Sequence, residues 1–218
     1  MDQIILGNKV FTNIKNIIFD LGGVILNINY NTTIESFKKI GFSNFDDIYG
    51  QMRQSHVFDK YDKGFILPSE FRNELRLVSK LNFTDESFDY AWNSMIHDIP
   101  AHRLETIKQL RNKFKIFLLS NTNEIHLSYF FNYVDSTFGK GTFESVFDKP
   151  YYSCRMGMRK PDLEIYHQLI KENHLKASES LFIDDTEFNV TAAMDAGLQA
   201  YHIKNTEDIS ELFTDYLI

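Results

Sequence analysis

Short apolar runs alternate along most of the chain with segments in which apolar residues recur every three or four positions, as they do in helices. Four runs have the unbroken apolar character of buried parallel strands, and they cover residues 16–21, 115–120, 180–185 and 199–203. The helical stripes between them contain Leu104, Ile107, Leu110 and Phe114, then Ile165, Leu169 and Ile170, and finally Val190, Ala193 and Met194, which Gly197 closes. Strands that alternate with such helices predict an α/β protein with a doubly wound parallel sheet.

Residues 30–100 interrupt this alternation. No strand pattern occurs there, whereas helical stripes recur, and the clearest contains Phe88, Ala91, Trp92, Met95 and Ile96. A turn within residues 62–71 separates two of the expected helices. Because crossover connections are usually short, an excursion of about 70 residues predicts a separate helical subdomain. The core is then expected to comprise residues 1–29 and 101–218, with the subdomain inserted after the first core strand.

Three of the expected strands end in polar residues. Asp20 follows the first apolar run, Ser120 and Asn121 follow the second, and Asp184 and Asp185 follow the third. The carboxyl ends of the strands form the binding crevice of an open α/β sheet, so these side chains are expected to converge there.

A glycine pair follows the first acid, in the stretch "IIFDLGGVILNI" at residues 17–28. Gly22 and Gly23 have no Cβ, so the backbone can come close to a ligand at this point. An alternative is structural, because Asp and Gly also form ordinary turns.

The composition is that of an ordinary globular protein, with 43% hydrophobic and 24% charged residues. A net charge of -7 disfavours a nucleic-acid surface, because phosphate backbones are bound by clustered Lys and Arg. A small anionic substrate held by a local cation remains compatible with this charge. The single cysteine, Cys154, excludes an internal disulfide and fits a reducing compartment, and we interpret it as a packed side chain.

No apolar run approaches the roughly 20 residues that cross a bilayer. The N-terminal residues lack the basic and apolar blocks of a signal peptide. We therefore expect a cytoplasmic protein without nucleic-acid or membrane partners, present as a monomer or a homodimer. The role of the first fifteen residues is left open.

The convergent acids suggest phosphoryl transfer. An aspartate can attack phosphorus and form an aspartyl-phosphate, which water then hydrolyses. The attack requires the charge of the phosphoryl group to be neutralised, and Mg²⁺ is the natural cation because it binds carboxylates and phosphate oxygens. Without a cation, Asp20, Asp184 and Asp185 would repel one another and raise one another's pKa.

Further candidates for phosphate binding lie in two other segments. Ser120 offers a hydroxyl donor, and the backbone amides of Asn121 and Thr122 can bond a phosphate oxygen. In "GMRKPD", Lys160 offers a fixed positive charge before Pro161, at the expected start of a helix.

The ordered set of Asp20, Ser120, Lys160 and the Asp184–Asp185 pair resembles the four motifs of the haloacid dehalogenase (HAD) superfamily. The phrases "FDLGGVI", "LLSNTN", "GMRKPD" and "FIDDTEFNVTAA" are especially similar to the bacterial α-glucose-1-phosphate phosphatase group, which is related to the phosphatase half of soluble epoxide hydrolase. The resemblance covers all but about fifteen N-terminal residues. It implies a Rossmann-like core and a helical type-1 cap near residues 30–100. It also implies a Mg²⁺-dependent phosphatase for a small phosphorylated metabolite, with a sugar phosphate such as glucose 1-phosphate favoured.

The resemblance implies a set of metal-binding residues. Asp20 would be both nucleophile and Mg²⁺ ligand, together with the backbone carbonyl of Gly22 and the carboxylate of Asp185. Asp184 would sit beside them and act on the metal through water. Asn189 would orient these groups from outside the ligand set.

The resemblance also implies how the phosphoryl group is held. Ser120 and Asn121 would bind its oxygens, with the neighbouring backbone of Thr122 and of Gly22–Gly23 lining the substrate site. Lys160 would bridge the phosphate and the nucleophile.

One position departs from the family pattern. Most family phosphatases carry an acid two residues after the nucleophile, which protonates the leaving alcohol and then activates water, and here that residue is Gly22. General acid–base catalysis contributes about 10²–10⁴-fold. A cap residue such as His56 or Asp59, a water or the substrate itself could replace the acid.

Each candidate also has a structural interpretation. One of Asp184 and Asp185 could cap the following helix, Lys160 could be a solvated surface residue, and Ser120 could make ordinary turn hydrogen bonds. The side chains of Phe58, Tyr61 and Trp92 could line a sugar pocket, although packing inside the cap is the simpler interpretation.

Three other functions are compatible with the same residues. In a 2-haloacid dehalogenase the aspartate attacks carbon and a halide leaves, which needs no acid at Gly22 but gives the Asp184–Asp185 pair no use. A phosphomutase would depend strongly on the missing acid. A phosphometabolite-binding protein without turnover is the third alternative.

Overall fold

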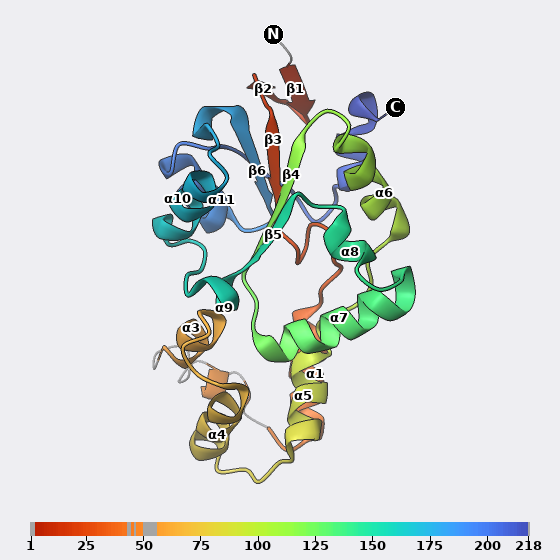
Figure 1. Cartoon of the computed structure of the whole chain (residues 1–218). Helices are drawn as coiled ribbons and strands as arrows, with labels where there is room; N and C mark the ends of the chain where they lie inside the picture. Colours follow the sequence, from red (N-terminus) through yellow and green to blue (C-terminus); the bar gives the residue numbers. More distant parts are fainter. Residues whose placement is uncertain (1–2, 43–44, 46, 50–55, 218) are drawn as a thin grey trace.

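A computed structural model describes residues 3–42, 45, 47–49 and 56–217, and its core is a five-stranded sheet (Figure 1). All neighbouring strands are parallel, in the order β5-β4-β3-β6-β7. The strands are β3 (Asn16–Phe19), β4 (Lys115–Ser120), β5 (Lys149–Tyr152), β6 (Ser180–Asp184) and β7 (Gln199–His202). Every residue of β3 is buried, as expected for a central strand covered on both faces. The predicted α/β class with a parallel sheet is confirmed.

The sequence pattern did not predict β5. This strand has only four residues, and Pro150 lacks the N–H that a central strand would donate to its neighbour. Strand β5 lies at the edge of the sheet, where proline is tolerated.

Helices cover both faces of the sheet (Figure 1). One face packs against α6 (Ala101–Leu110), α7 (Glu124–Phe138), α8 (Thr142–Ser145) and α12 (Ile209–Leu212). The other packs against α10 (Leu163–Glu172) and α11 (Glu187–Asp195). Residues of β3 alternate between the two apolar clusters, with Ile17 and Phe19 in one and Ile18 in the other. The predicted stripe of α11 is wrong at Met194, which is 50% exposed, because the buried face turns through Val190 and Ala193 instead.

The first residues form an antiparallel hairpin of β1 (Gln3–Leu6) and β2 (Lys9–Thr12). Its inward residues Ile4, Leu6 and Phe11 are buried in the larger cluster of the core. The Phe11 ring meets Tyr201 of β7 edge-on, with ring centroids 6.2 Å apart. The segment whose role was left open therefore extends the hydrophobic core.

A second unit beyond the sheet, which we call the cap, includes the helices α1 (Tyr30–Lys39), α3 (Val57–Asp62), α4 (Pro68–Ser79) and α5 (Asp85–Asn93) (Figure 1). Phe37, Phe71 and Phe88 are fully buried at its centre, so the cap has an apolar core of its own. The stripe predicted for α5 is only partly right. Met95 and Ile96 lie beyond the end of α5, and both pack against the sheet-side cluster instead.

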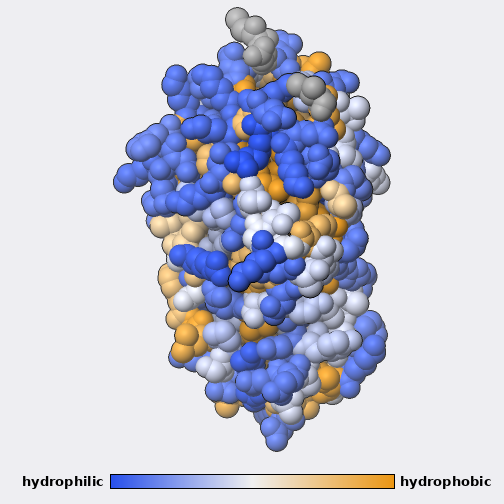
Figure 2. Space-filling model, turned by 45° about the vertical axis from the view of Figure 1, so that its right-hand side comes forward, coloured by the Kyte–Doolittle hydropathy of each residue, from blue (hydrophilic) through white to orange (hydrophobic). Residues whose placement is uncertain are grey.

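The surface of both units is mainly hydrophilic on the face shown in Figure 2. Within the part of the chain that the structure describes, no helix has the length and apolar character needed to span a membrane.

Candidate active site

The carboxyl ends of three neighbouring strands bring the predicted acids and Ser120 together. Asp20 directly follows β3, Ser120 ends β4 and Asp184 ends β6, and β3 pairs with both other strands. A cavity of about 650 Å³ lies at this edge, between the sheet and the cap. Its walls include Asp20, Ser120 and Asp185 from the core, and Phe58, Asp62 and Trp92 from the cap.

The three acids form a tight cluster. Asp20, Asp184 and Asp185 each place a carboxylate oxygen within 4.8 Å of the others. Burial raises the pKa of Asp20; Lys160 opposes this rise, and the charges of Asp184 and Asp185 add to it. Burial and the charge of Asp184 also raise the pKa of Asp185. Carboxylates that repel one another in a partly dry site provide the donor set that a hard divalent cation prefers.

Lys160 is buried in the middle of this cluster and is only 1% exposed. Its Nζ donates to Asp20 Oδ1 at 2.6 Å, to Asp184 Oδ2 at 2.7 Å and to the carbonyl of Leu119 at 2.8 Å. Burial alone would lower the pKa of Lys160, but the attraction of Asp184 and Asp20 outweighs it and raises the pKa. The interpretation of Lys160 as a solvated surface residue is wrong. The expected helix start is also displaced, since α10 begins at Leu163.

Asp184 is fully buried, and both of its carboxylate oxygens accept hydrogen bonds from the protein. Oδ1 accepts from the Thr186 N–H at 2.8 Å, and Asn189 Nδ2 lies 3.1 Å from each oxygen. Lys160 donates to Oδ2 as well, so the position of the Asp184 carboxylate is fixed by hydrogen bonds. Asn189 therefore lies where a residue that orients Asp184 should lie.

Neither of the two acids occupies the N-cap position of α11, where the capping interpretation expected one. The N-cap residue is Thr186, and its side chain makes no capping hydrogen bond. Asp185 instead turns toward the glycine pair. A Cβ on Gly23 would lie 2.2 Å from Asp185 Oδ2, and Gly23 has a φ of +75°. The glycine thus leaves the space that the Asp185 carboxylate needs at the cluster.

The side chain of Asn121 bonds the backbone of Lys160 in both directions. Its Nδ2 donates to the Lys160 carbonyl at 2.8 Å, and its Oδ1 accepts from the Lys160 N–H at 2.9 Å. The prediction that this side chain binds phosphoryl oxygens is therefore not supported, because the side chain instead holds the Lys160 loop against β4. The Ser120 hydroxyl has only a 3.5 Å contact with the carbonyl of Asn121, so it can rotate toward a ligand.

The next residue, Thr122, lines the cavity, but its backbone N–H, which the sequence predicts to bond a phosphate oxygen, instead bonds Ser153. Its N–H donates to Ser153 Oγ at 2.9 Å, and the same hydroxyl donates back to the Thr122 carbonyl at 2.9 Å. The strand-end segment that carries Ser120 is therefore fixed on both sides, by Lys160 and by Ser153.

The space beside Gly22 is filled by an apolar side chain. A Cβ built on Gly22 would lie 3.2 Å from Ile28 Cδ1. Of the cap residues considered as a replacement acid, His56 is exposed and precedes α3 with a φ of +59°. Asp59 does line the cavity, but it pairs with Lys63 at 3.3 Å and with Arg159 at 3.5 Å.

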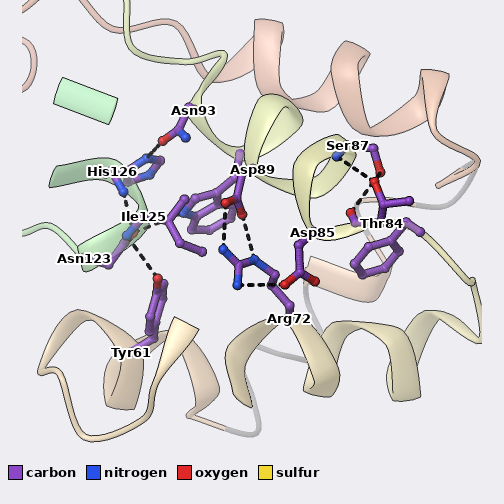
Figure 3. A network of polar contacts seen from close by, with 12 residues as sticks. Tyr61, Arg72, Thr84, Asp85, Ser87, Asp89, Asn93, Asn123, Ile125 and His126 are labelled. Atoms are coloured by element: carbon purple, nitrogen blue, oxygen red, sulfur yellow. Dashed lines mark hydrogen bonds and ion pairs between the residues drawn. The ribbon is translucent and has the colours of Figure 1, made fainter. Parts of the chain in front are cut away.

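The three aromatic candidates divide between the two interpretations. Phe58 and Trp92 line the cavity, with parallel rings whose centroids are 5.8 Å apart. Tyr61 is 1% exposed and packs inside the cap, so it does not line a sugar pocket. Its hydroxyl accepts a bond from the backbone N–H of Ile125 at 3.2 Å, which ties the cap to the first turn of α7 (Figure 3).

Several cavity residues were missed by the sequence reasoning. Asn123 Oδ1 accepts from the His126 N–H at 3.1 Å, and His126 Nδ1 lies 2.9 Å from Asn93 Oδ1 (Figure 3). Burial lowers the pKa of His126 to about 3, so this ring is neutral at pH 7. Asp62 and Arg159 face each other across the boundary between cap and core, with 3.6 Å between Arg159 Nη2 and Asp62 Oδ2. No sequence spacing links these positions, because they come from separate elements.

Comparison with known proteins gives consistent matches over most of the chain. The model of the haloacid dehalogenase-like hydrolase family matches residues 14–197. A D-ribitol-5-phosphate phosphatase of Bacteroides thetaiotaomicron is 32% identical over 195 residues, which cover 89% of this chain and 94% of that protein.

Solved structures agree with these matches. A HAD-family enzyme of Bacteroides thetaiotaomicron, in complex with magnesium and inorganic phosphate, has a TM-score of 0.81 and 39% identity over 92% of this chain and 99% of that chain. A HAD-like hydrolase from Porphyromonas gingivalis has a TM-score of 0.81 and 32% identity over 94% and 98% of the two chains. A dehalogenase with a TM-score of 0.60, which covers 87% of this chain and 84% of its own, is 14% identical and shares the fold alone.

Proposed function

Because the chain belongs to the haloacid dehalogenase-like hydrolase family, we propose that it is a Mg²⁺-dependent phosphatase that hydrolyses a small phosphomonoester through an aspartyl-phosphate on Asp20. Membership in the family confirms the predicted superfamily and the predicted hydrolase class. One observation carries the proposal: Asp20 lies at a cavity, in a cluster with Asp184 and Asp185, and bonds to the buried cation of Lys160. This arrangement holds a nucleophilic carboxylate beside positive charge, which phosphoryl transfer requires.

The residues present fit a magnesium ion. Asp20, Asp185 and the backbone carbonyl of Gly22 would hold it, and the missing side chain at Gly23 leaves Asp185 the room to do so. Asp184 would act indirectly, because its oxygens already accept from Lys160, Asn189 and a backbone N–H. When bound, Mg²⁺ neutralises charge on the phosphoryl group.

The other residues of the site have roles that follow from their contacts. Lys160 holds the Asp20 carboxylate in place through a 2.6 Å bond and opposes the rise in its pKa that burial causes. Ser120 is free to donate its hydroxyl hydrogen to a phosphoryl oxygen. Asn121 acts through the backbone of Lys160, so it positions the lysine and does not bind phosphate with its side chain.

We assign the substrate to the phosphorylated sugars and polyols. The cavity, at about 650 Å³, combines the aromatic side chains of Phe58 and Trp92 with polar groups such as Asn123. Apolar and aromatic walls suit the C–H surface of a sugar or polyol chain, and polar groups suit its hydroxyls. The relative named for D-ribitol 5-phosphate makes open-chain polyol phosphates the first candidates, with glucose 1-phosphate beside them.

The test is phosphate release from a panel of phosphorylated metabolites, with magnesium and with a chelator. We expect release that requires magnesium and is fastest for a polyol or sugar phosphate. Full activity in the chelator would contradict the proposal. Halide release from a 2-haloacid without metal would support the dehalogenase alternative instead.

The variant Asp20→Asn separates an enzyme from a binding protein. The amide cannot attack phosphorus, so we expect phosphate release to disappear while the polyol phosphate still binds. If the wild-type protein binds the ligand but releases no phosphate, the chain is a binding protein.

A further inference from the structure

A phosphatase of this kind needs a group that protonates the leaving alcohol, and Gly22 supplies none. We propose that Asp62, at the end of helix α3 in the cap, is this acid–base residue. The inference rests on the proposed phosphatase activity and adds a catalytic residue to it.

The core side of the cavity offers no replacement. The space next to Gly22 is occupied by the Ile28 side chain, 3.2 Å from the position of a Cβ. The three core carboxylates of the acid cluster are committed to Lys160 or to the proposed cation. Among the residues that the structure describes, the cavity wall has three further carboxyl groups, on Asp59, Asp62 and Asp162.

Two of these three carboxyl groups share a nearby ammonium group. Lys63 Nζ lies 2.9 Å from Asp162 Oδ2 and 3.3 Å from Asp59 Oδ2. Both carboxyl groups are therefore held in ion pairs with Lys63. Asp62 has a weaker partner, since its nearest cation is Arg159 Nη2 at 3.6 Å, and that guanidinium also faces Asp59.

The surroundings of Asp62 favour a carboxyl that can gain and lose a proton near neutral pH. Its side chain is 22% exposed, and burial raises its pKa to about 6 against the opposing effects of Arg159 and a hydrogen bond from Asn123; Asp59 raises it slightly. The charge of Asp62 also acts on the nearby thiol of Cys154. Burial is the main cause that raises the pKa of this thiol to about 12, so the thiol stays neutral. A pKa near the working pH is the property that general acid–base catalysis requires.

Asp62 lines the same cavity as Asp20 and Asp185. Asn123, which bonds to it, lies three residues after Ser120 on the strand-end segment. The phenol of Tyr30 has a pKa raised to about 12, by burial and then by the negative charges of Asp185, Asp20, Tyr49 and Asp62. Asp62 and two acids of the cluster therefore lie near enough to Tyr30 to raise the pKa of the same phenol, which lines the cavity. A leaving group that points from Asp20 toward the cap would meet Asp62.

The chemistry balances over two steps. In the first, Asp20 forms a bond to phosphorus, the bond from phosphorus to the alcohol oxygen breaks, and the proton of the Asp62 carboxyl moves to that oxygen. In the second, water attacks the phosphorus, its proton moves to the Asp62 carboxylate, and the bond to Asp20 breaks. Phosphate leaves, and both carboxyl groups return to their starting states.

The variant Asp62→Asn tests the proposal, because it keeps the size of the side chain and removes the acid. D-ribitol 5-phosphate has an alcohol leaving group that needs protonation, whereas p-nitrophenyl phosphate releases a phenolate that does not. We expect kcat/KM, which reports the first step alone, to fall about 100-fold or more for D-ribitol 5-phosphate and to change by less than about threefold for p-nitrophenyl phosphate. The matched control is Asp59→Asn, one helical turn away on the same wall, which should leave the ratio between the two substrates unchanged.

The outcomes separate the inference from the proposed function. An equal loss of kcat/KM on both substrates, or no loss on either, would overturn the role of Asp62 while phosphatase activity stands. The same change of ratio in Asp59→Asn would overturn it as well. A wild-type protein that is inactive on both substrates would overturn the proposed function and the inference together. Retained p-nitrophenyl phosphate turnover in Asp62→Asn also shows that the variant is folded.

Discussion

The carboxylate of Asp185 occupies the space in which a side chain on Gly23 would stand, since a Cβ there would lie 2.2 Å from Asp185 Oδ2. We therefore expect Gly23→Ala to push Asp185 out of the acid cluster. The magnesium concentration for half-maximal phosphatase activity should rise about tenfold or more, as measured in a magnesium titration.

Gly141→Ala is the control for backbone strain. Gly141 has a similar φ of +73°, but a Cβ there meets no atom within 4 Å. Both variants place alanine in the left-handed region, which costs roughly 1–2 kcal/mol. Gly141→Ala should lose stability without changing the magnesium requirement. An equal requirement in both variants would show that Asp185 needs no space at Gly23.

Lys160→Met should lower the stability of the fold. It leaves Asp20 and Asp184 buried without their cation, and the removal of one partner from such a pair costs roughly 3–5 kcal/mol. Magnesium should restore part of this loss, because it supplies positive charge beside Asp20 and binds only the folded protein. Urea unfolding with and without magnesium measures both effects.

The matched control is Lys149→Met, at an ion pair with Glu172 in which both side chains are about 40% exposed. Exposed pairs contribute less than about 1 kcal/mol, so this variant should unfold almost as the wild type does. Equal losses of stability in the two variants would show that the buried ion pairs of Lys160 contribute no more to the free energy of unfolding than an exposed pair does.

The pH dependence of kcat/KM follows from the raised pKa of Asp62. Its proton is needed in the first step, so activity on D-ribitol 5-phosphate should fall about tenfold per pH unit above a pKa of about 6. The charged groups facing Asp62 are Arg159 and Asp59. With p-nitrophenyl phosphate, and in Asp62→Asn with either substrate, this alkaline fall should be absent. A fall that persists in the variant would belong to another group.

The sequence was sufficient to predict the positions that follow a regular pattern. Strands β3, β4 and β6 each contain an unbroken apolar run, and a polar residue ends or directly follows each strand, so the convergence of Asp20, Ser120 and Asp184 follows from the topology of a parallel sheet. The N-terminal hairpin also had a signal, because Gly7 and Asn8 form a two-residue turn between short runs.

Other features depend on contacts that no spacing records. Arg159 and Asp62 are 97 positions apart and meet only because the cap docks beside the loop that carries Lys160. The Asn121 side chain looked free to bind phosphate, and only the structure shows it paired with the Lys160 backbone. Tertiary packing thus determines which polar residues of a motif remain free for chemistry.

The N-terminal hairpin should contribute to stability and not to catalysis. Within β1, Leu6 is fully buried in the core cluster, whereas its neighbour Ile5 is 53% exposed. Leu6→Ala should therefore lower the free energy of unfolding by roughly 2–5 kcal/mol, and Ile5→Ala by about 0.5 kcal/mol or less. Urea unfolding measures both changes, and kcat at a temperature where both variants are folded should match the wild type. A reduced kcat in folded Leu6→Ala would mean that the hairpin, although it packs at the opposite end of the core from the cap, also shapes the active site.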